Sequence, residues 1–133
     1  MIRVIAIGKT RQAFVRDGVD EFLTRLGKYV KIEYKEAEKI PPTTGYLIAL
    51  DEHGKEFTSQ AFAKKVAQWT MAHKDTTFII GPAEGLPAEI LEKCNEKISL
   101  STMTFPTQLV RLIFIEQLYR AFTIIKGEPY HKE

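Results

Sequence analysis

The sequence has one cysteine, no cluster of metal ligands and no long uninterrupted apolar run. Cys94 has no second cysteine to pair with, which excludes an internal disulfide. The three histidines form no ligand-spaced cluster with it, so we expect no metal site. The most apolar stretch, LVRLIFIEQLYRAFTII (109–125), carries three charged residues. It therefore predicts a buried helix rather than a membrane span.

The motifs of several common enzyme classes are also missing. IGKT (7–10) follows an apolar run, but a P-loop needs a glycine five residues before Gly8, where Arg3 stands. No G-x-G-x-x-G follows any predicted strand, and no nucleophile elbow occurs. Low-complexity tracts and repeats of solenoid length are absent as well. These absences argue against a P-loop enzyme, a dinucleotide-binding Rossmann enzyme, a hydrolase with that elbow and a disordered chain.

What is present is the composition of a compact protein, with an uneven distribution of charge. The 133 residues are 44% hydrophobic and 27% charged, which predicts a single domain over residues 1–133. With no charged and then apolar leader, the sequence predicts a cytoplasmic protein. Residues 1–31 hold seven basic and three acidic residues, a net charge of +4, and the remainder nets −2. This asymmetry fits a surface facing a polyanion and a solvated helix face about equally well.

Short apolar runs alternate with helical patterns along the chain. Strands are predicted over residues 2–8, 30–35, 46–50, 76–80 and 98–101. Helices are predicted over residues 11–29, from Thr58 or Ser59 through an inward face that includes His73, from Pro87, and from Pro106 to about Ile125. The strict alternation of residues 30–35 favours an edge strand, followed by a turn at PPTTG (41–45). We therefore predict an α/β fold with a mostly parallel five- to six-stranded sheet and helices on both faces.

Three loops follow the carboxyl ends of predicted strands. They are LDEHGK (50–55), IGPAEGL (80–86) and LSTMTFP (100–106). Because these ends share one edge of a parallel sheet, we expect the loops to lie together where ligands usually bind. Gly81 and Gly85 let a ligand approach the backbone closely. Turn chemistry explains any single loop better than binding does, but three loops together favour a site.

The final predicted helix is apolar nearly all round, with Glu116 and Arg120 four residues apart. Either a dimer interface covers its outer face, or it is a core helix with one satisfied ion pair. Arg120 could instead hold a phosphate or a carboxylate. The chain then ends in KGEPYHKE (126–133), where Tyr130 and His131 belong either to a mobile terminus or to a working tail.

Several longer motifs occur in order along the whole chain. They are IAIGK, EFLTRL, LDEHGKEFTSQAFA, FIIGPAEGL, LSTMTFPTQLVRLIFIEQLYRAF and PYHKE. Together they resemble the RlmH family, the SPOUT-superfamily methyltransferases of large-subunit ribosomal RNA. The resemblance implies S-adenosyl-L-methionine as methyl donor, a homodimer and a C-terminal trefoil knot. It also implies methylation at N3 of a pseudouridine in the 23S ribosomal RNA of assembled ribosomes.

The resemblance also implies where the site lies. Its cofactor pocket falls on Leu50, Gly81, Gly85, Leu100, Ser101, Thr102, Met103, Thr104 and Phe105. We expect the tail to turn back over these loops and to supply the catalytic residues. His131 is the candidate base because histidine titrates near neutrality, and Tyr130 could stack on or orient the target base. Arg120 or Lys132 could hold phosphate or balance negative charge. In a dimer the tail serves either its own pocket or its partner's.

Two features depart from the family's usual pattern. Pro82 stands where a second glycine is usual, which removes an N–H and fixes φ in the cofactor loop. Residues 36–45 form a short segment where relatives usually carry a longer basic one, so the grip on RNA should differ. Two alternatives therefore stay open: a SPOUT methyltransferase with another RNA target, and a non-enzymatic ribosome-binding module that uses the basic first helix.

Overall fold

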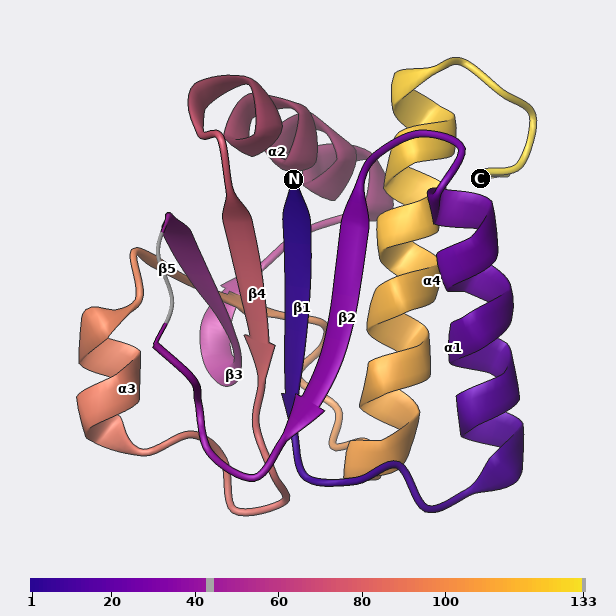
Figure 1. Ribbon diagram of the computed structural model, residues 1–133. Coiled ribbons are helices and arrows are strands. Elements are labelled where there is room, and N and C mark those ends of the chain that lie inside the picture. Colours follow the sequence, from indigo (N-terminus) through magenta and orange to yellow (C-terminus); the bar gives the residue numbers. More distant parts are fainter. Residues whose placement is uncertain (43–44, 133) are drawn as a thin grey trace.

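The computed structural model describes residues 1–42 and 45–132. Thr43 and Thr44, in the predicted turn, and Glu133, at the end of the tail, lie outside the described residues. Within them, one parallel sheet has the strand order β2-β1-β4-β3-β5 (Figure 1). Its strands are β1 (Ile2–Ile7), β2 (Ile32–Ala37), β3 (Tyr46–Glu56), β4 (Thr76–Ile80) and β5 (Glu96–Ser99). The predicted parallel α/β fold is confirmed, with the lower of the two expected numbers of strands.

The helices cover both faces of this sheet. They are α1 (Ala13–Leu26), α2 (Ser59–Ala72), α3 (Ala88–Lys93) and α4 (Thr107–Ile125). α4 packs between α1 and α2, whereas Figure 1 shows α3 apart from these three helices, beyond β5. Right-handed connections explain this division. The connections from β1 to β2 and from β3 to β4 run toward the β2 edge of the sheet, whereas the connection from β4 to β5 runs toward the β5 edge. None of the helices in the described chain is both long and apolar enough to cross a membrane.

The core lies between the sheet and the group formed by α1, α2 and α4. β4 is buried along its whole length because it is central and covered on both faces. At the contact between α1 and α4, a Cβ on Gly18 would lie 2.7 Å from Leu112 Cδ1, so glycine allows these helices to approach closely. The largest fully buried side chains include Ile2, Val4, Val15, Leu26, Ile48, Val66, Phe78, Phe114, Ile115 and Leu118.

The predicted edge strand is confirmed, with a shifted start. β2 lies at the edge of the sheet and begins at Ile32 rather than Val30. The shift has a local cause, because the N–H groups of Tyr29 and Val30 still bond to the carbonyl oxygen of Leu26 at the end of α1. β5 likewise runs over residues 96–99 rather than 98–101, since Ser99 already begins the next turn.

A polar cluster ties α2 to the amino-terminal ends of β3 and β5. The carboxylate of Glu96 accepts hydrogen bonds from Tyr46 Oη at 2.5 Å and Trp69 Nε1 at 2.6 Å, and Lys65 Nζ lies 3.5 Å away. The bond to Glu96 raises the pKa of Tyr46 to about 12. Burial alone would raise the pKa of Glu96, but the two hydrogen bonds and Lys65 hold it below its ordinary value. His73, predicted on the inward face of α2, instead follows the helix and stacks on Tyr46, with ring centroids 4.0 Å apart.

We predict that Glu96→Gln lowers the free energy of unfolding by about 1–3 kcal/mol near pH 7, because the buried Trp69 N–H and Tyr46 hydroxyl lose a charged acceptor. A carboxylate with a depressed pKa stabilises the fold above its unfolded pKa of about 4.3 and loses this contribution as pH falls through the folded pKa. The difference between the two proteins should therefore shrink in acid. Urea denaturation across pH measures it.

The matched control for this prediction is Glu33→Gln. The side chain of Glu33 is 55% exposed and lies 3.9 Å from Arg3, so its loss should change stability by less than about 0.5 kcal/mol. Equal losses in the two variants would contradict the role assigned to Glu96.

Candidate functional site

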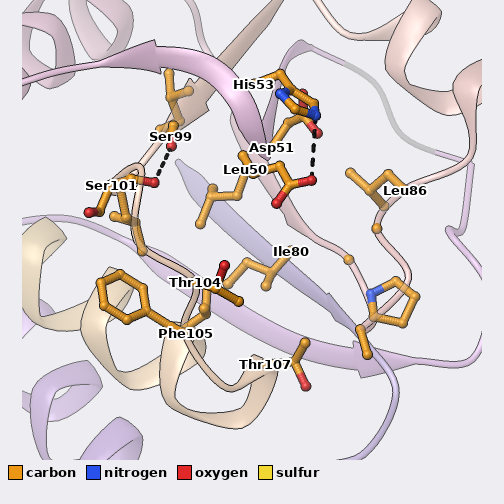
Figure 2. Close-up of a pocket in the computed structure, with 18 of the residues that line it drawn as sticks. Leu50, Asp51, His53, Ile80, Leu86, Ser99, Ser101, Thr104, Phe105 and Thr107 are labelled. Atoms are coloured by element: carbon orange, nitrogen blue, oxygen red, sulfur yellow. Dashed lines mark hydrogen bonds and ion pairs between the residues drawn. The ribbon is translucent and has the colours of Figure 1, made fainter.

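A cavity of about 430 Å³ opens at the carboxyl ends of the strands, and the three predicted loops line it. Figure 2 shows Leu50 and Ile80 at its floor, with Phe105 and Leu86 on different sides. Eight of the nine predicted cofactor residues line the cavity: Leu50, Gly81, Gly85, Leu100, Ser101, Met103, Thr104 and Phe105. Thr102 is exposed and is absent from the lining. The loops therefore meet as the sequence predicted, and their role in cofactor binding stays a prediction.

The first of these loops is a bulge inside β3 rather than the end of a strand. Leu50 pairs with Ile98 of β5, and Lys55 pairs with the same residue. The four residues between them carry acidic side chains and His53 to the rim of the cavity. A Cβ on Gly54 would lie 2.6 Å from the backbone N of Ile98, so only glycine lets the chain return to β5 here. The sequence pattern missed this return, because its apolar signal ends at Leu50.

The glycines of the second loop serve the loop's own conformation. The N–H of Gly85 donates to the carbonyl oxygen of Pro82 at 2.9 Å, and Gly85 has a φ of +83°. A Cβ on Gly81 would lie 2.8 Å from Leu86 Cγ, so this loop closes tightly on itself. Pro82 contributes its carbonyl to the turn, which does not need the N–H that proline lacks. Gly81 and Gly85 thus allow the tight conformation of this loop and also line the cavity.

The third loop is held by two serine side chains. Ser99 Oγ donates to the carbonyl oxygen of Ser101 at 3.0 Å, as Figure 2 shows, and Ser101 Oγ accepts from the N–H of Met103 at 3.0 Å. Within the described residues, the N–H groups of Thr104 and Phe105 donate no hydrogen bond to the protein. Both residues line the cavity, so we regard their N–H groups as candidate donors to a ligand.

The charge of the cavity is acidic. Asp51, Glu52 and Glu84 are among its lining residues, and the described part of the chain adds no lysine or arginine to them. Glu52 Oε1 lies 3.4 Å from His53 Nε2 at the rim. Such a cavity attracts a cationic group and repels phosphate. The sequence carries this signal in the acidic residues of the loops 50–55 and 80–86, but only the fold shows that they share one cavity.

The three predicted catalytic residues form one cluster, in which Arg120 and Tyr130 contact Glu116 and His131 contacts Arg120. Arg120 Nη2 lies 2.6 Å from Glu116 Oε2, and Tyr130 Oη donates to the same oxygen at 2.8 Å. Arg120 Nη1 lies 3.1 Å from His131 Nδ1, and its guanidinium stacks over the Tyr130 ring at 4.8 Å. Burial and the bond to Glu116 raise the pKa of Tyr130. The ion pair of Glu116 with Arg120, one of the alternatives left open by the sequence, is present, and Tyr130 is a second partner of Glu116 that the sequence did not identify.

This cluster lies at the far end of α4 from the cavity. Thr107 and Val110, in the first turn of α4, line the cavity, whereas the tail follows the last turn (Figure 1). The expectation that the tail turns back over the cofactor loops is wrong within one chain. The physical reason is local: Gly127, at a φ of +70°, reverses the chain, and Tyr130 then packs edge-on against Tyr119 at 4.8 Å.

Comparison with known proteins adds independent findings. Residues 33–131 match a family model described as "Predicted SPOUT methyltransferase". The chain is 40% identical to "Ribosomal RNA large subunit methyltransferase H" of Anaeromyxobacter sp. (strain Fw109-5), covering 98% of this chain and 99% of that protein. It is 37% identical to the protein of the same name from Streptococcus thermophilus (strain CNRZ 1066), with the same coverage.

A solved structure supports the fold. A "probable methylase family protein" from Haemophilus influenzae Rd KW20 superposes with a TM-score of 0.65, covering 99% of this chain and 70% of that chain. The two sequences are only 12% identical, so the likeness concerns the fold alone.

We predict that Gly54→Ala destabilises the protein by about 1–3 kcal/mol, because the overlap with Ile98 is with backbone and no side-chain rotation relieves it. Gly27→Ala is the control, since Gly27 has helical dihedrals and a Cβ there would meet nothing closer than 3.4 Å. Denaturant titration of both variants tests this. An unchanged Gly54→Ala protein would contradict the return of β3 against β5.

Proposed function

Because the chain belongs to the ribosomal RNA large subunit methyltransferase H family of SPOUT methyltransferases, we propose that it methylates N3 of a pseudouridine in 23S ribosomal RNA of assembled ribosomes. The methyl donor of this proposal is S-adenosylmethionine. The observation that carries the proposal is the meeting of the family's three cofactor loops at one acidic cavity.

The cavity suits this cofactor in size, polarity and charge. Its volume lies in the usual range for small-molecule sites, about 300–1,000 Å³. Leu50, Ile80 and Phe105 offer apolar walls to an adenine ring, and the N–H groups of Thr104 and Phe105 are candidate donors for its edge or for ribose. The acidic rim favours the positive sulfonium and amino groups. When bound, S-adenosylmethionine supplies a methyl group that its sulfonium has already activated.

The tail cluster fits the electrostatic demand of the reaction. N3 of a pseudouridine bears a proton, which passes to solvent water before N3 bonds to the methyl carbon and the methyl–sulfur bond breaks, so the ring's oxygens carry negative charge until that bond forms. Arg120 keeps a positive charge beside His131 and Tyr130, and Glu116 fixes its direction. Placed over the target base, these groups would stabilise that negative charge.

The contact between Arg120 and His131 revises the role expected of the histidine. Arginine has no acceptor, so Nδ1 of His131 must accept the hydrogen bond. The neutral ring then carries its proton on Nε2 and presents an N–H donor there. We therefore assign His131 the role of donating to an oxygen of the target base, in place of the base catalysis expected from sequence.

Two copies of the chain are needed to bring the cluster and the cavity together. The 19 residues of α4 span about 28 Å, with the cavity at one end and the cluster beyond the other. We propose a homodimer in which the tail of one copy completes the cavity of its partner. A second hollow of about 170 Å³ beside α4 supports this, because the half-buried Ile113 and Gln117 line it and a partner could fill it.

We also propose the trefoil knot that the family implies. β5 ends on the edge of the sheet beside β3, yet α4 lies on the face opposite α3. Residues 100–106 make this passage alongside the loop 81–86, and the two segments share the cavity. A crossing of the chain at this point would build the cofactor site from the knot itself.

The test of the activity is transfer of label from S-adenosylmethionine to ribosomes that lack the modification. We expect label in 23S RNA, at one pseudouridine, with a known family member active alongside. Label at another nucleotide would sink the assigned target but keep the cofactor. Absence of transfer, with no cofactor binding by calorimetry, would favour a ribosome-binding module.

We predict that His131→Ala lowers kcat by roughly a hundredfold or more and leaves the affinity for S-adenosylmethionine nearly unchanged. The reason is that His131 lies away from the cofactor cavity of its own chain and acts on the target base. Calorimetry and single-turnover methylation measure the two quantities. Equal loss of both would contradict this role.

Mixing two inactive variants tests the exchange of tails. His131→Ala keeps the cavity intact, and Gly81→Val keeps the tail intact while pressing a side chain against Leu86 in the cavity wall. Mixed dimers should regain activity, because one cavity then meets one intact tail. If mixing restores nothing while both variants form dimers, the tail does not act on the partner.

A further inference from the structure

The loop between β1 and α1 carries two exposed cations beside the cavity. Lys9 and Arg11 follow the carboxyl end of β1, the edge at which the cavity opens. Gln108 of α4 fixes both, because its Nε2 donates to the carbonyl oxygen of Lys9 at 3.1 Å and its Oε1 accepts from the N–H of Arg11 at 2.8 Å. Thr107 and Val110, in the same turn of α4, line the cavity. The two cations are therefore held on the helical turn that forms the cavity wall.

Arginine side chains of α1 and α4 hold the backbone between Lys9 and Arg11 in place. Arg111, which is 3% exposed, donates from Nη1 to Thr10 Oγ1 and from Nη2 to the carbonyl oxygen of Ile7, both at 2.9 Å. Arg16 donates to the carbonyl oxygen of Thr10 at 3.0 Å. A loop that is already ordered loses little conformational entropy when it binds a partner. This loop is therefore prepared for binding rather than a mobile surface turn.

An exposed aromatic ring stands next to the two cations. Phe14, in the first turn of α1, is 60% exposed. It lies one turn before Gly18 on the same helix face, and Gly18 packs against Leu112 of α4. Because side chains lean toward the start of their helix, Phe14 leans toward the edge that holds Lys9 and Arg11. Asp17 is the one acidic residue of the first turn and a half of α1, so the positive charge is only partly offset.

We propose that Lys9, Arg11 and Phe14 form a surface for unpaired RNA, in which the cations hold phosphates and Phe14 stacks on a base. This RNA surface rests on the proposed function for its substrate class and deepens it. The acidic rim of the cavity repels phosphates, so the backbone of the RNA is drawn to this side of α4 while the cavity admits the cationic cofactor. Two of the basic residues that give residues 1–31 their net positive charge thus belong to the proposed RNA surface.

The test measures binding of the full-length protein to a fluorescein-labelled single-stranded oligouridylate at increasing KCl. We expect Lys9→Ala/Arg11→Ala to weaken binding and to flatten the slope of log affinity against log salt by roughly 1 to 1.5, as two lost phosphate contacts require. Phe14→Ala should weaken binding about tenfold with an unchanged slope, and Phe14→Trp should restore it. Lys28→Ala/Lys31→Ala removes the same charge from exposed positions beyond the other end of α1 and should change little.

Three results would overturn the assignment. Equal effects of the two double variants would show that net charge alone attracts RNA. Unchanged affinity in the Lys9, Arg11 and Phe14 variants would remove the surface. Dissociation of a dimer by Phe14→Ala, seen by sedimentation, with normal RNA affinity would make this face a contact between copies. If the oligouridylate results hold while ribosomes are not methylated, the RNA surface stands and the proposed target fails.

Discussion

A buried arginine joins the parts of the fold on which the rest depends. The guanidinium of Arg111 bonds to Ile7, Thr10 and Glu36, which end β1, begin the next loop and belong to β2. Thr10 Oγ1 and N–H also bond to Glu36, so the charge buried at Arg111 is neutralised by a carboxylate that is itself satisfied. A charge in this position tolerates few arrangements of its neighbours. The start of α4 is therefore fixed against two strands, and with it the wall of the cavity and the loop that carries Lys9 and Arg11.

Different groups of residues lie at the two ends of the strands of the parallel sheet. The amino-terminal ends of β3 and β5 carry Glu96, whose partners stabilise the contact with α2. The carboxyl-terminal ends carry loops whose glycines and serines satisfy local backbone demands and leave a cavity between them. A third set of polar groups stands past the end of α4, away from the cavity at the carboxyl-terminal ends of the strands. One helix thus separates the proposed cofactor site from the proposed catalytic cluster, and this is the geometric argument for proposing that two copies of the chain act together.

Much of this arrangement could be predicted from the sequence, because strand ends, glycines and helix periodicity are local signals. The pattern located β4 over the same residues as the structure and placed β2 at the edge. It could not show that β3 resumes after residues 51–54, since pairing with Ile98 depends on a strand more than forty residues away. Nor could it show the direction of the tail, which follows from one left-handed glycine and a tyrosine packing on its own helix. The backbone pairing of β3 with a distant strand and the packing of one tail side chain on its own helix were thus outside the local pattern of the sequence.

The same distinction explains why charge was ambiguous in the sequence and informative in the structure. A net charge of +4 over residues 1–31 combines residues that serve different ends of the molecule. Arg3 and Arg25 pair with carboxylates, and Arg16 braces a carbonyl, so these cations hold the protein together. Lys9 and Arg11 use only their backbone groups for that purpose, which leaves their side-chain charges available to a partner. The polyanion-facing interpretation therefore concerns Lys9 and Arg11 in our proposal, and Arg3, Arg16 and Arg25 have partners within the protein. Lys9 and Arg11 lie at the edge where an RNA base could reach the cavity.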